Sequence, residues 1–415
     1  MRIAFISFEY PADSHYGGIA TYVKQAAEMF TEMGHSVEVF SSSPFKGSSE
    51  MQEEVFVHRI KLENNKSDHH QFRALIVEKF TERHSKIPFD IVETPEYFAE
   101  GMDIKKAFPL LPMVVKFHTP TFLLEEMYYG KVTFARKCKY YKNYLLYDIR
   151  YGKQFEPFWK YNKSKDPEFI FTSKYADGYC TPSADLGRII AERWSINRSD
   201  IINLPNLFVP SIQMLQIPVE NRRSKENVIV TFVGRLETRK GIYTLIDAIP
   251  LVLAKHPDVI FRFMGAAQES IVKGLDVGMY LLNKLSEYKN SLQLLGKITY
   301  DELPKYLEDT DICVFPSLWE NFPNVCLEAM CAGRAVVGSK AGGMADMIVH
   351  KTSGLLCNPN DINDLANSIS WLIENTQARI NMGINARKKV LEAYNKEVIY
   401  NKTIQFYKKV IQDKI

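Results

Sequence analysis

Residues 228–241 read VIVTFVGRLETRKG, and this stretch decides the fold. A short run of apolar, largely β-branched residues meets Gly234, and a helical pattern then runs to about Lys255. Residues 2–8, RIAFISF, begin the same way and lead through a glycine-containing loop into a helical pattern at 19–33. A buried strand, a glycine turn and a helix are how a doubly wound parallel sheet starts. The sequence therefore predicts two such domains in tandem.

Strand and helix patterns alternate after both starts, as expected of an α/β protein. The segment 206–227 contains Pro210 and Pro218 and is the predicted linker. We expect one Rossmann-like domain over residues 1–206 and a second over residues 207–394. A helix over about 395–415 is expected to pack back on the first domain. Two such domains create a cleft at the carboxyl ends of their strands, where a ligand is expected.

The bulk composition excludes several classes of protein. Of 415 residues, 46% are hydrophobic and 24% charged, which is typical of a soluble globular protein. The formal net charge of +3 is small for this length, so no nucleic-acid partner is expected. The six cysteines form no CxxC pair, and no apolar run is long enough to span a membrane. We expect a cytoplasmic protein, attached at most to the inner face of the plasma membrane.

The loop that follows residues 228–233 is the first candidate site. Gly234, Arg235 and Lys240 lie at a helix start, where backbone N–H groups and cations suit a diphosphate. The loop matches neither GxGxxG nor the Walker A pattern, which disfavours a dinucleotide oxidoreductase or a nucleoside triphosphatase. An ordinary strand-to-helix turn with solvated basic residues explains the pattern equally well.

The second candidate is ENFPNVCLE, residues 320–328, which places Glu320 in a loop and Glu328 on the following helix. Two carboxylates separated in this way can accept hydrogen bonds from two sugar rings of one ligand. A carboxylate that the helix dipole satisfies is the alternative for Glu328.

Two further candidates lie in the first half. Gly17 and Gly18 precede a helix and allow a ligand close to the backbone, although a plain tight turn also fits. His118 ends the predicted strand 113–117 and would point into the cleft. A lone histidine is nevertheless more often a structural residue than a catalytic one.

The GRxxxxKG loop, the E-x7-E spacing and the downstream GGMAD at 342–346 together resemble the retaining GT-B glycosyltransferases of group 1, over essentially the whole chain. That group includes bacterial polysaccharide and lipid sugar transferases. The resemblance implies that Arg235 and Lys240 bind the donor's diphosphate and that Glu328 holds the ribose. It further implies that Glu320, with the N–H groups near Asn321, Phe322 and Pro323, holds the transferred sugar.

The same resemblance assigns roles in the first half and at the boundary. It places Gly17 and Gly18 at the cleft, His118 against the donor sugar and Asn206 near the donor at the hinge. The implied catalytic residues are His118, Glu320, Arg235 and Lys240. The implied donor-binding residues are Gly17, Gly18, Asn206, Gly234, Arg235, Lys240, Glu320, Asn321, Phe322, Pro323, Asn324 and Glu328.

This chain departs from the family at two positions. It has Asn321 where glycine is frequent and Asp346 where glutamate is frequent. The first change bears on the shape of the sugar pocket, and the second shortens one contact.

The resemblance implies a metal-independent reaction without a cofactor, in which basic residues neutralise the diphosphate. Asp309-Thr310-Asp311 has the form of a metal-binding DxD but precedes a buried strand, and we interpret it as a helix end. The implied product is a glycan or a lipid-linked glycoconjugate of the bacterial cell surface. A 2-epimerase acting on sugar nucleotides and a noncatalytic nucleotide-sugar-binding protein remain the alternatives.

Residues 131–165 combine ten Lys or Arg with ten aromatic residues and only two acidic ones. That mixture suits an anionic membrane surface near the acceptor. A packed helical insertion with solvated Lys and Arg is the competing interpretation.

Overall fold

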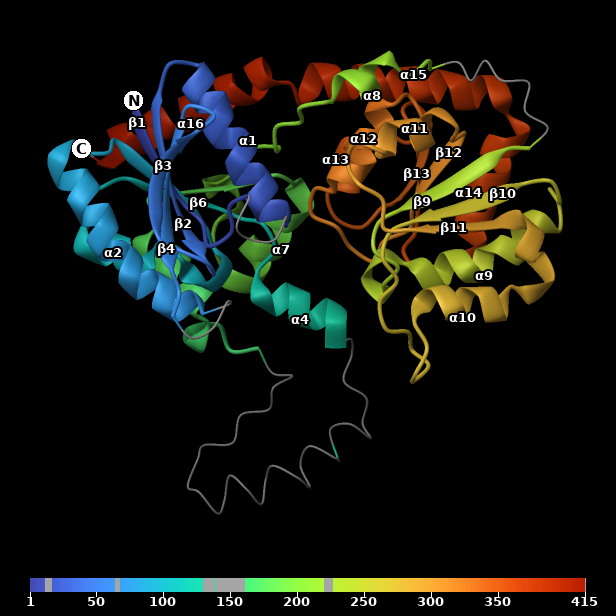
Figure 1. Ribbon diagram of the computed structural model, residues 1–415, viewed down its shortest axis with the longest axis horizontal. Coiled ribbons are helices and arrows are strands. Elements are labelled where there is room, and N and C mark those ends of the chain that lie inside the picture. Colours follow the sequence, from blue (N-terminus) through green and yellow to red (C-terminus); the bar gives the residue numbers. More distant parts are fainter. Residues whose placement is uncertain (12–16, 64–67, 130–137, 139–160, 220–226, 415) are drawn as a thin grey trace.

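The computed structural model describes residues 1–11, 17–63, 68–129, 138, 161–219 and 227–414. Two α/β domains lie side by side, each built on a mainly parallel sheet (Figure 1). The predicted fold class is therefore confirmed. The basic aromatic segment 131–165 lies almost entirely outside the described residues, and only Cys138 and its end, from Tyr161, are described.

The first domain holds an eight-stranded sheet of order β3-β4-β2-β1-β5-β6-β7-β8, parallel except where β3 meets β4. Its strands are β1 (Arg2–Ile6), β2 (Ser36–Ser43), β3 (Ser48–Gln52), β4 (Val55–Lys61), β5 (Ile91–Pro95), β6 (Met113–Lys116), β7 (Gly178–Thr181) and β8 (Ile201–Asn203). Its main helices are α1 (Gly18–Glu32), α2 (His69–Lys86), α3 (Met102–Ala107), α4 (Thr121–Tyr129), α6 (Pro167–Tyr175) and α7 (Ala184–Trp194). β1 is buried along its whole length, as expected from the apolar residues Ile3–Ile6 that follow Arg2.

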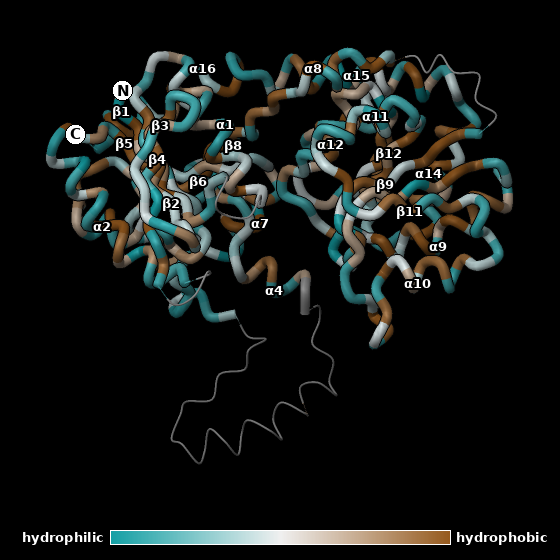
Figure 2. Tube along the Cα trace, viewed as in Figure 1, coloured by the Kyte–Doolittle hydropathy of each residue, from teal (hydrophilic) through white to brown (hydrophobic). Residues whose placement is uncertain are grey.

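The second domain holds a parallel sheet of order β11-β10-β9-β12-β13-β14. Its strands are β9 (Ile229–Val233), β10 (Ile260–Met264), β11 (Leu292–Gly296), β12 (Ile312–Phe315), β13 (Ala335–Ser339) and β14 (Leu355–Cys357). Its helices are α9 (Ile242–Leu253), α10 (Val277–Lys284), α11 (Leu303–Glu308), α12 (Asn324–Cys331), α13 (Met344–Met347), α14 (Ile362–Glu374) and α15 (Thr376–Ala393). Apolar residues of α9, α10 and α14 form one core with the strands, and those of α11, α12 and α13 form another. The hydropathy of the chain follows this layering, with apolar strands inside and polar outer turns (Figure 2).

The chain crosses between the domains twice. The predicted linker carries a short helix, α8 (Ile212–Gln216), and the final helix, α16 (Lys396–Lys414), lies along the first domain (Figure 1). Tyr407 of α16 is fully buried and donates its hydroxyl to the Glu93 carboxylate at 2.5 Å. The two crossings meet, because the Phe208 N–H donates to the Tyr394 carbonyl at 2.9 Å.

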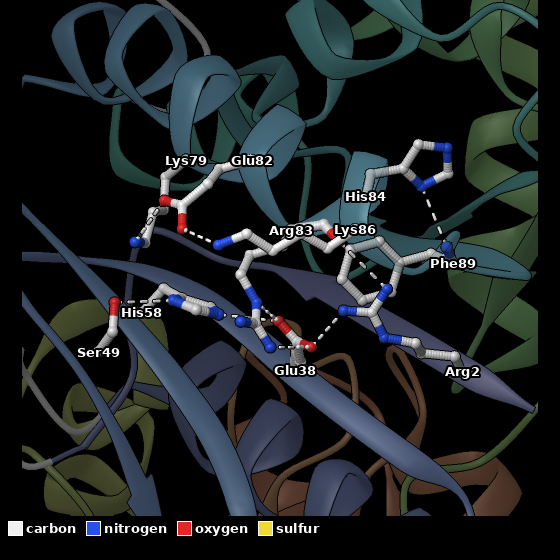
Figure 3. A network of polar contacts seen from close by, with 10 residues as sticks. All are labelled: Arg2, Glu38, Ser49, His58, Lys79, Glu82, Arg83, His84, Lys86 and Phe89. Carbon is white, nitrogen blue, oxygen red and sulfur yellow. Dashed lines mark hydrogen bonds and ion pairs between the residues drawn. The ribbon is translucent and has the colours of Figure 1, made fainter.

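A buried carboxylate on β2 links the first sheet to α2 through hydrogen bonds. Glu38 of β2 accepts from Arg2 at 2.5 Å, His58 at 2.8 Å and Arg83 at 2.9 Å (Figure 3). Burial alone would raise the pKa of Glu38, but these three hydrogen bonds outweigh it and lower the pKa to about 2.

Across the described residues, no helix is both long enough and apolar enough to cross a bilayer.

Candidate active site

The loops that follow β9 and β12 lie directly against each other. Gly241 has φ +69°, and a Cβ there would come within 1.8 Å of the Pro316 carbonyl oxygen. Only glycine fits this position. The close approach brings Arg239 and Lys240 to the loop that carries Glu320. The Leu318 N–H donates to the Arg239 carbonyl at 2.9 Å and holds the two loops together.

Charges of alternating sign run along this contact. Glu320 Oε1 lies 2.6 Å from Arg239 Nη1 and 2.7 Å from Lys240 Nζ. Glu237 Oε1 lies 3.2 Å from both Arg239 Nη2 and Arg235 Nη2. The Arg235 side chain is 53% exposed, whereas those of Arg239 and Lys240 are 15% and 16% exposed. Arg235 is thus the most exposed of these three cations.

Arg239 is the residue that sequence reasoning missed in this loop. The sequence shows adjacent basic residues but not which of them turns inward. Its position two residues after Glu237 and one before Lys240 was the available signal. The structure places Arg239 between two carboxylates, so it orients Glu320.

Glu328 is buried in the second turn of α12, with 7% of the residue exposed. Burial raises the pKa of its carboxyl to about 7. Within the described part of the chain, no side chain or backbone group donates to this carboxyl. Its place in the second turn weakens the alternative in which the dipole at the helix start satisfies it. A buried carboxyl that lacks a protein partner among these residues suits a ligand hydroxyl.

His118 follows β6 and lies on the first domain's side of the boundary between the domains. Its backbone N–H donates to both oxygens of Glu96 at 3.0 and 2.9 Å. Burial, with a smaller effect of the Lys116 charge, lowers the pKa of His118 to about 3. The ring is therefore neutral near pH 7 and lies 5.3 Å from the Tyr22 ring. A neutral imidazole can exchange hydrogen bonds with a sugar hydroxyl.

Two buried carboxyls, unrecognised in the sequence, support this face. Glu96 holds the peptide of His118, and Glu168 accepts from the Phe98 N–H at 3.1 Å and the Thr121 N–H at 2.8 Å. Burial raises the pKa of both, that of Glu168 to about 7. Phe98 has φ +49° and Ala99 +54°, the left-handed strain that clusters at functional sites.

The remaining first-half candidates lie as follows. Gly17 is the N-cap of α1, and a Cβ there would lie 2.5 Å from Glu9 Oε2. Gly18 begins the helix, and no heavy atom of the described residues lies within 4 Å of a Cβ built on it. Asn206, beside the first crossing, has a buried Oδ1 without a hydrogen-bond partner in the described ranges.

The residues around Glu328 divide into two groups. The Phe322 ring packs against Tyr394, with centroids 5.3 Å apart, and so points into the second core. Pro323 is the N-cap of α12, and Asn324 is its first residue. Asn321 and Asp346 instead contact the first domain. Asp346 Oδ2 accepts from the Ala184 N–H at 2.7 Å.

The Asp309–Asp311 segment makes a structural contact with the second sheet. Asp311 Oδ2 accepts from the Ile229 N–H at 2.9 Å, at the start of β9. Throughout the described ranges, no group of three or more His, Cys, Asp or Glu residues is arranged to hold a metal ion.

Comparison with solved structures defines the class of fold. Sucrose-phosphate synthase from Thermosynechococcus elongatus aligns over 99% of each chain, with a TM-score of 0.71 and 21% identity. Anabaena HepE in complex with UDP-glucose covers 99% of this chain and 100% of its own, with a TM-score of 0.68 and 17% identity. The protein therefore has the two-domain GT-B fold.

Sequence comparison then gives the family. Residues 16–208 match the model for glycosyltransferase family 4, and residues 214–389 match that for glycosyl transferases group 1. The chain belongs to the group 1 glycosyltransferases. An uncharacterized glycosyltransferase of Methanocaldococcus jannaschii is 32% identical over 182 residues, which are 43% of this chain and 44% of that protein. The chain spans about half the length of the curated relatives it matches.

Proposed function

We propose that the protein is a retaining, metal-independent glycosyltransferase. It moves a hexosyl unit from a nucleotide diphosphate sugar to a hydroxyl of a glycan or lipid-linked acceptor, in the synthesis of bacterial cell-surface polysaccharide or glycoconjugate. One observation carries the proposal. Glu328 is a buried carboxyl without a partner among the described residues, eight positions after a carboxylate that two cations orient. The complex of Anabaena HepE with UDP-glucose supports a donor of this class.

Each side chain then has a role in the transfer. Glu328 accepts the ribose hydroxyls, and Glu320 accepts hydroxyls of the sugar. Breaking the sugar–phosphate bond leaves negative charge on the diphosphate, which Arg235, Lys240 and nearby N–H groups stabilise. Neutral His118 hydrogen-bonds the sugar from the first domain. The departing phosphate takes the proton of the acceptor hydroxyl on the same face, so configuration is retained without a side-chain nucleophile.

Donor identity is tested by thermal shift with UDP-, GDP- and ADP-glucose in parallel. The matching donor binds the folded state alone and raises the Tm by several degrees. Slow hydrolysis of that donor without acceptor separates an enzyme from a noncatalytic binding protein. Absence of any shift and of any hydrolysis would contradict the proposal. Appearance of a 2-epimer of the sugar nucleotide would favour the isomerase instead.

The acceptor side has its own test, because the segment 131–165 is proposed to hold the enzyme at an anionic membrane surface. Vesicles of phosphatidylglycerol and phosphatidylcholine are floated with the full chain, and phosphatidylcholine vesicles alone are the control. Co-flotation only with the anionic vesicles supports the membrane role. Co-flotation with neither removes it and leaves a packed insertion.

A further inference from the structure

Asn321 carries a direct contact between the two domains. It follows Glu320 in the donor loop, and both ends of its carboxamide are used. Its Oδ1 accepts from the Ser183 hydroxyl at 2.7 Å, and its Nδ2 donates to the backbone carbonyl of His118. One side chain of the second domain therefore joins two loops of the first, those that follow β6 and β7.

The surroundings of Asn321 are close-packed, so this contact is part of a built interface. A Cβ on Gly343 would lie 1.8 Å from the Asn321 carbonyl oxygen and 2.9 Å from the Ser183 Cβ. Ser183 is also the N-cap of α7, accepting from the Leu186 N–H at 3.3 Å.

Three more hydrogen bonds cross the same boundary beside Asn321. Asp185 Oδ2 accepts from Trp319 Nε1 at 2.9 Å and from the Gly342 N–H at 3.1 Å. The third is the bond from the Ala184 N–H to Asp346. The start of α7 is thus held by both loops that border the proposed sugar site.

The chemistry of the contact selects asparagine. A backbone carbonyl can only accept, so the group facing His118 must donate. The Ser183 hydroxyl donates to the other end of the amide. Glycine, frequent here in the family that the chain resembles, supplies neither group. Aspartate has nearly the same shape but would set an anionic oxygen against the carbonyl.

We propose that Asn321 is a positioning residue that couples the donor loop to His118 across the domain boundary. The inference rests on the proposed function. It adds a contact that links the donor loop of the second domain to His118 of the first. Glu96 of the first domain holds the N–H of His118, and Asn321 of the second holds its C=O. The orientation of the His118 backbone, and of the ring it carries, thus depends on the residue that follows Glu320. Productive geometry at the sugar therefore requires both domains to be in contact.

The test compares Asn321→Ala and Asn321→Asp with the wild type and with Asn381→Ala, an exposed asparagine on α15. Turnover of UDP-, GDP- and ADP-glucose is measured, together with binding of UDP, GDP and ADP. We expect kcat to fall about tenfold in Asn321→Ala and further in Asn321→Asp. Binding of the nucleoside diphosphate, whose proposed contacts are Arg235, Lys240 and Glu328 of the second domain, should stay within about twofold. A general folding defect would weaken both.

Small-angle X-ray scattering without ligand gives a readout independent of the reaction. We expect a larger radius of gyration for both Asn321 variants than for the wild type and Asn381→Ala, because the contact between the domains is weakened. A kcat within about twofold of the wild type for Asn321→Ala would overturn the proposal. If the wild type turned over none of the three donors, the proposed function would fail. Scattering alone would then test the contact. Identical scattering curves for the Asn321 variants and the wild type would show that Asn321 does not hold the domains together.

Discussion

The two domains present faces of opposite character at the candidate site, one charged and one neutral. The second domain carries a row of ion pairs of alternating sign, made by Glu237, Arg239, Glu320 and Lys240. Arg235 pairs with Glu237 and extends this row into solvent. On the first domain, His118 is neutral, and the buried carboxyls beside it hold backbone N–H groups instead of cations. A diphosphate needs positive charge, whereas sugar hydroxyls need fixed donors and acceptors. Under the proposed function, the charged face suits the diphosphate, and neutral His118 adds hydrogen bonds to the sugar that Glu320 also contacts.

The largest effect is expected on the charged face. Replacing Lys240 by alanine removes a cation from the leaving diphosphate and from Glu320, so turnover should fall by about 1,000-fold. Glu320→Ala should be similarly inactive, and both variants should keep the wild-type melting profile within a few degrees. Lys305→Ala, on α11, is the matched control. Wild-type turnover in either site variant would show that these ion-paired residues are not needed for the transfer.

The next effect is on stability and lies in the first domain, away from the cleft. The folded pKa of Glu38 is about 2, below its usual value of 4.5. Its contribution is therefore present above about pH 4.5 and is lost as the pH falls towards 2. It amounts to about 3 kcal/mol. Urea unfolding at pH 7 and at pH 3 measures how much the free energy of unfolding falls between the two. This decrease should be smaller for Glu38→Gln than for the wild type. Equal losses would show that the network in Figure 3 does not govern acid stability.

Glu328 should show opposite effects on stability and binding. Its folded pKa is raised to about 7, so the stabilising contribution of the neutral form is present below pH 4.5 and is lost as the pH rises through 7. Glu328→Gln should therefore melt higher than the wild type at pH 8.5, with little difference at pH 4.5. The same variant should bind its nucleoside diphosphate about tenfold more weakly by calorimetry, because an acceptor for the ribose is lost. Tighter binding by the variant would contradict the ribose role.

The smallest expected effect is on the neutral face. With a pKa of about 3, His118 should not titrate between pH 5 and 8. NMR of the histidine ring protons, assigned with His118→Gln, should show a flat chemical shift over that range. A midpoint near 6.5 would show a solvated ring and would remove the contrast between the two faces.

The sequence predicted most of the fold because buried parallel strands carry continuous apolar runs. β3 was missed for the converse reason: residues 48–52, SSEMQ, are polar and mostly exposed, and the strand forms only by pairing with β4 at the sheet edge. The helix α8 was also missed. Its five residues lie in a segment that contains two prolines, where local patterns indicate a loop.

Residues of the candidate site were visible in the sequence where they share one motif. Glu320 and Glu328 belong to a single loop and helix, so their spacing was visible. Arg239 escaped because its contact with Glu320 depends on how loops 81 residues apart in sequence meet. Ser183 and Glu168 escaped for the same reason, since their partners lie on distant segments.

The paired crossings of the chain constrain how the two halves can move. Because the Phe208 N–H donates to the Tyr394 carbonyl, the two connections between the domains lie against each other at this point. This shared point opposes sliding of the domains past each other, so rotation about it is the freer motion. The Tyr394 ring also packs on Phe322, two residues from Glu320. A rotation that separates Asn321 from Ser183 would therefore turn about a point whose Tyr394 ring contacts the loop that carries Glu320.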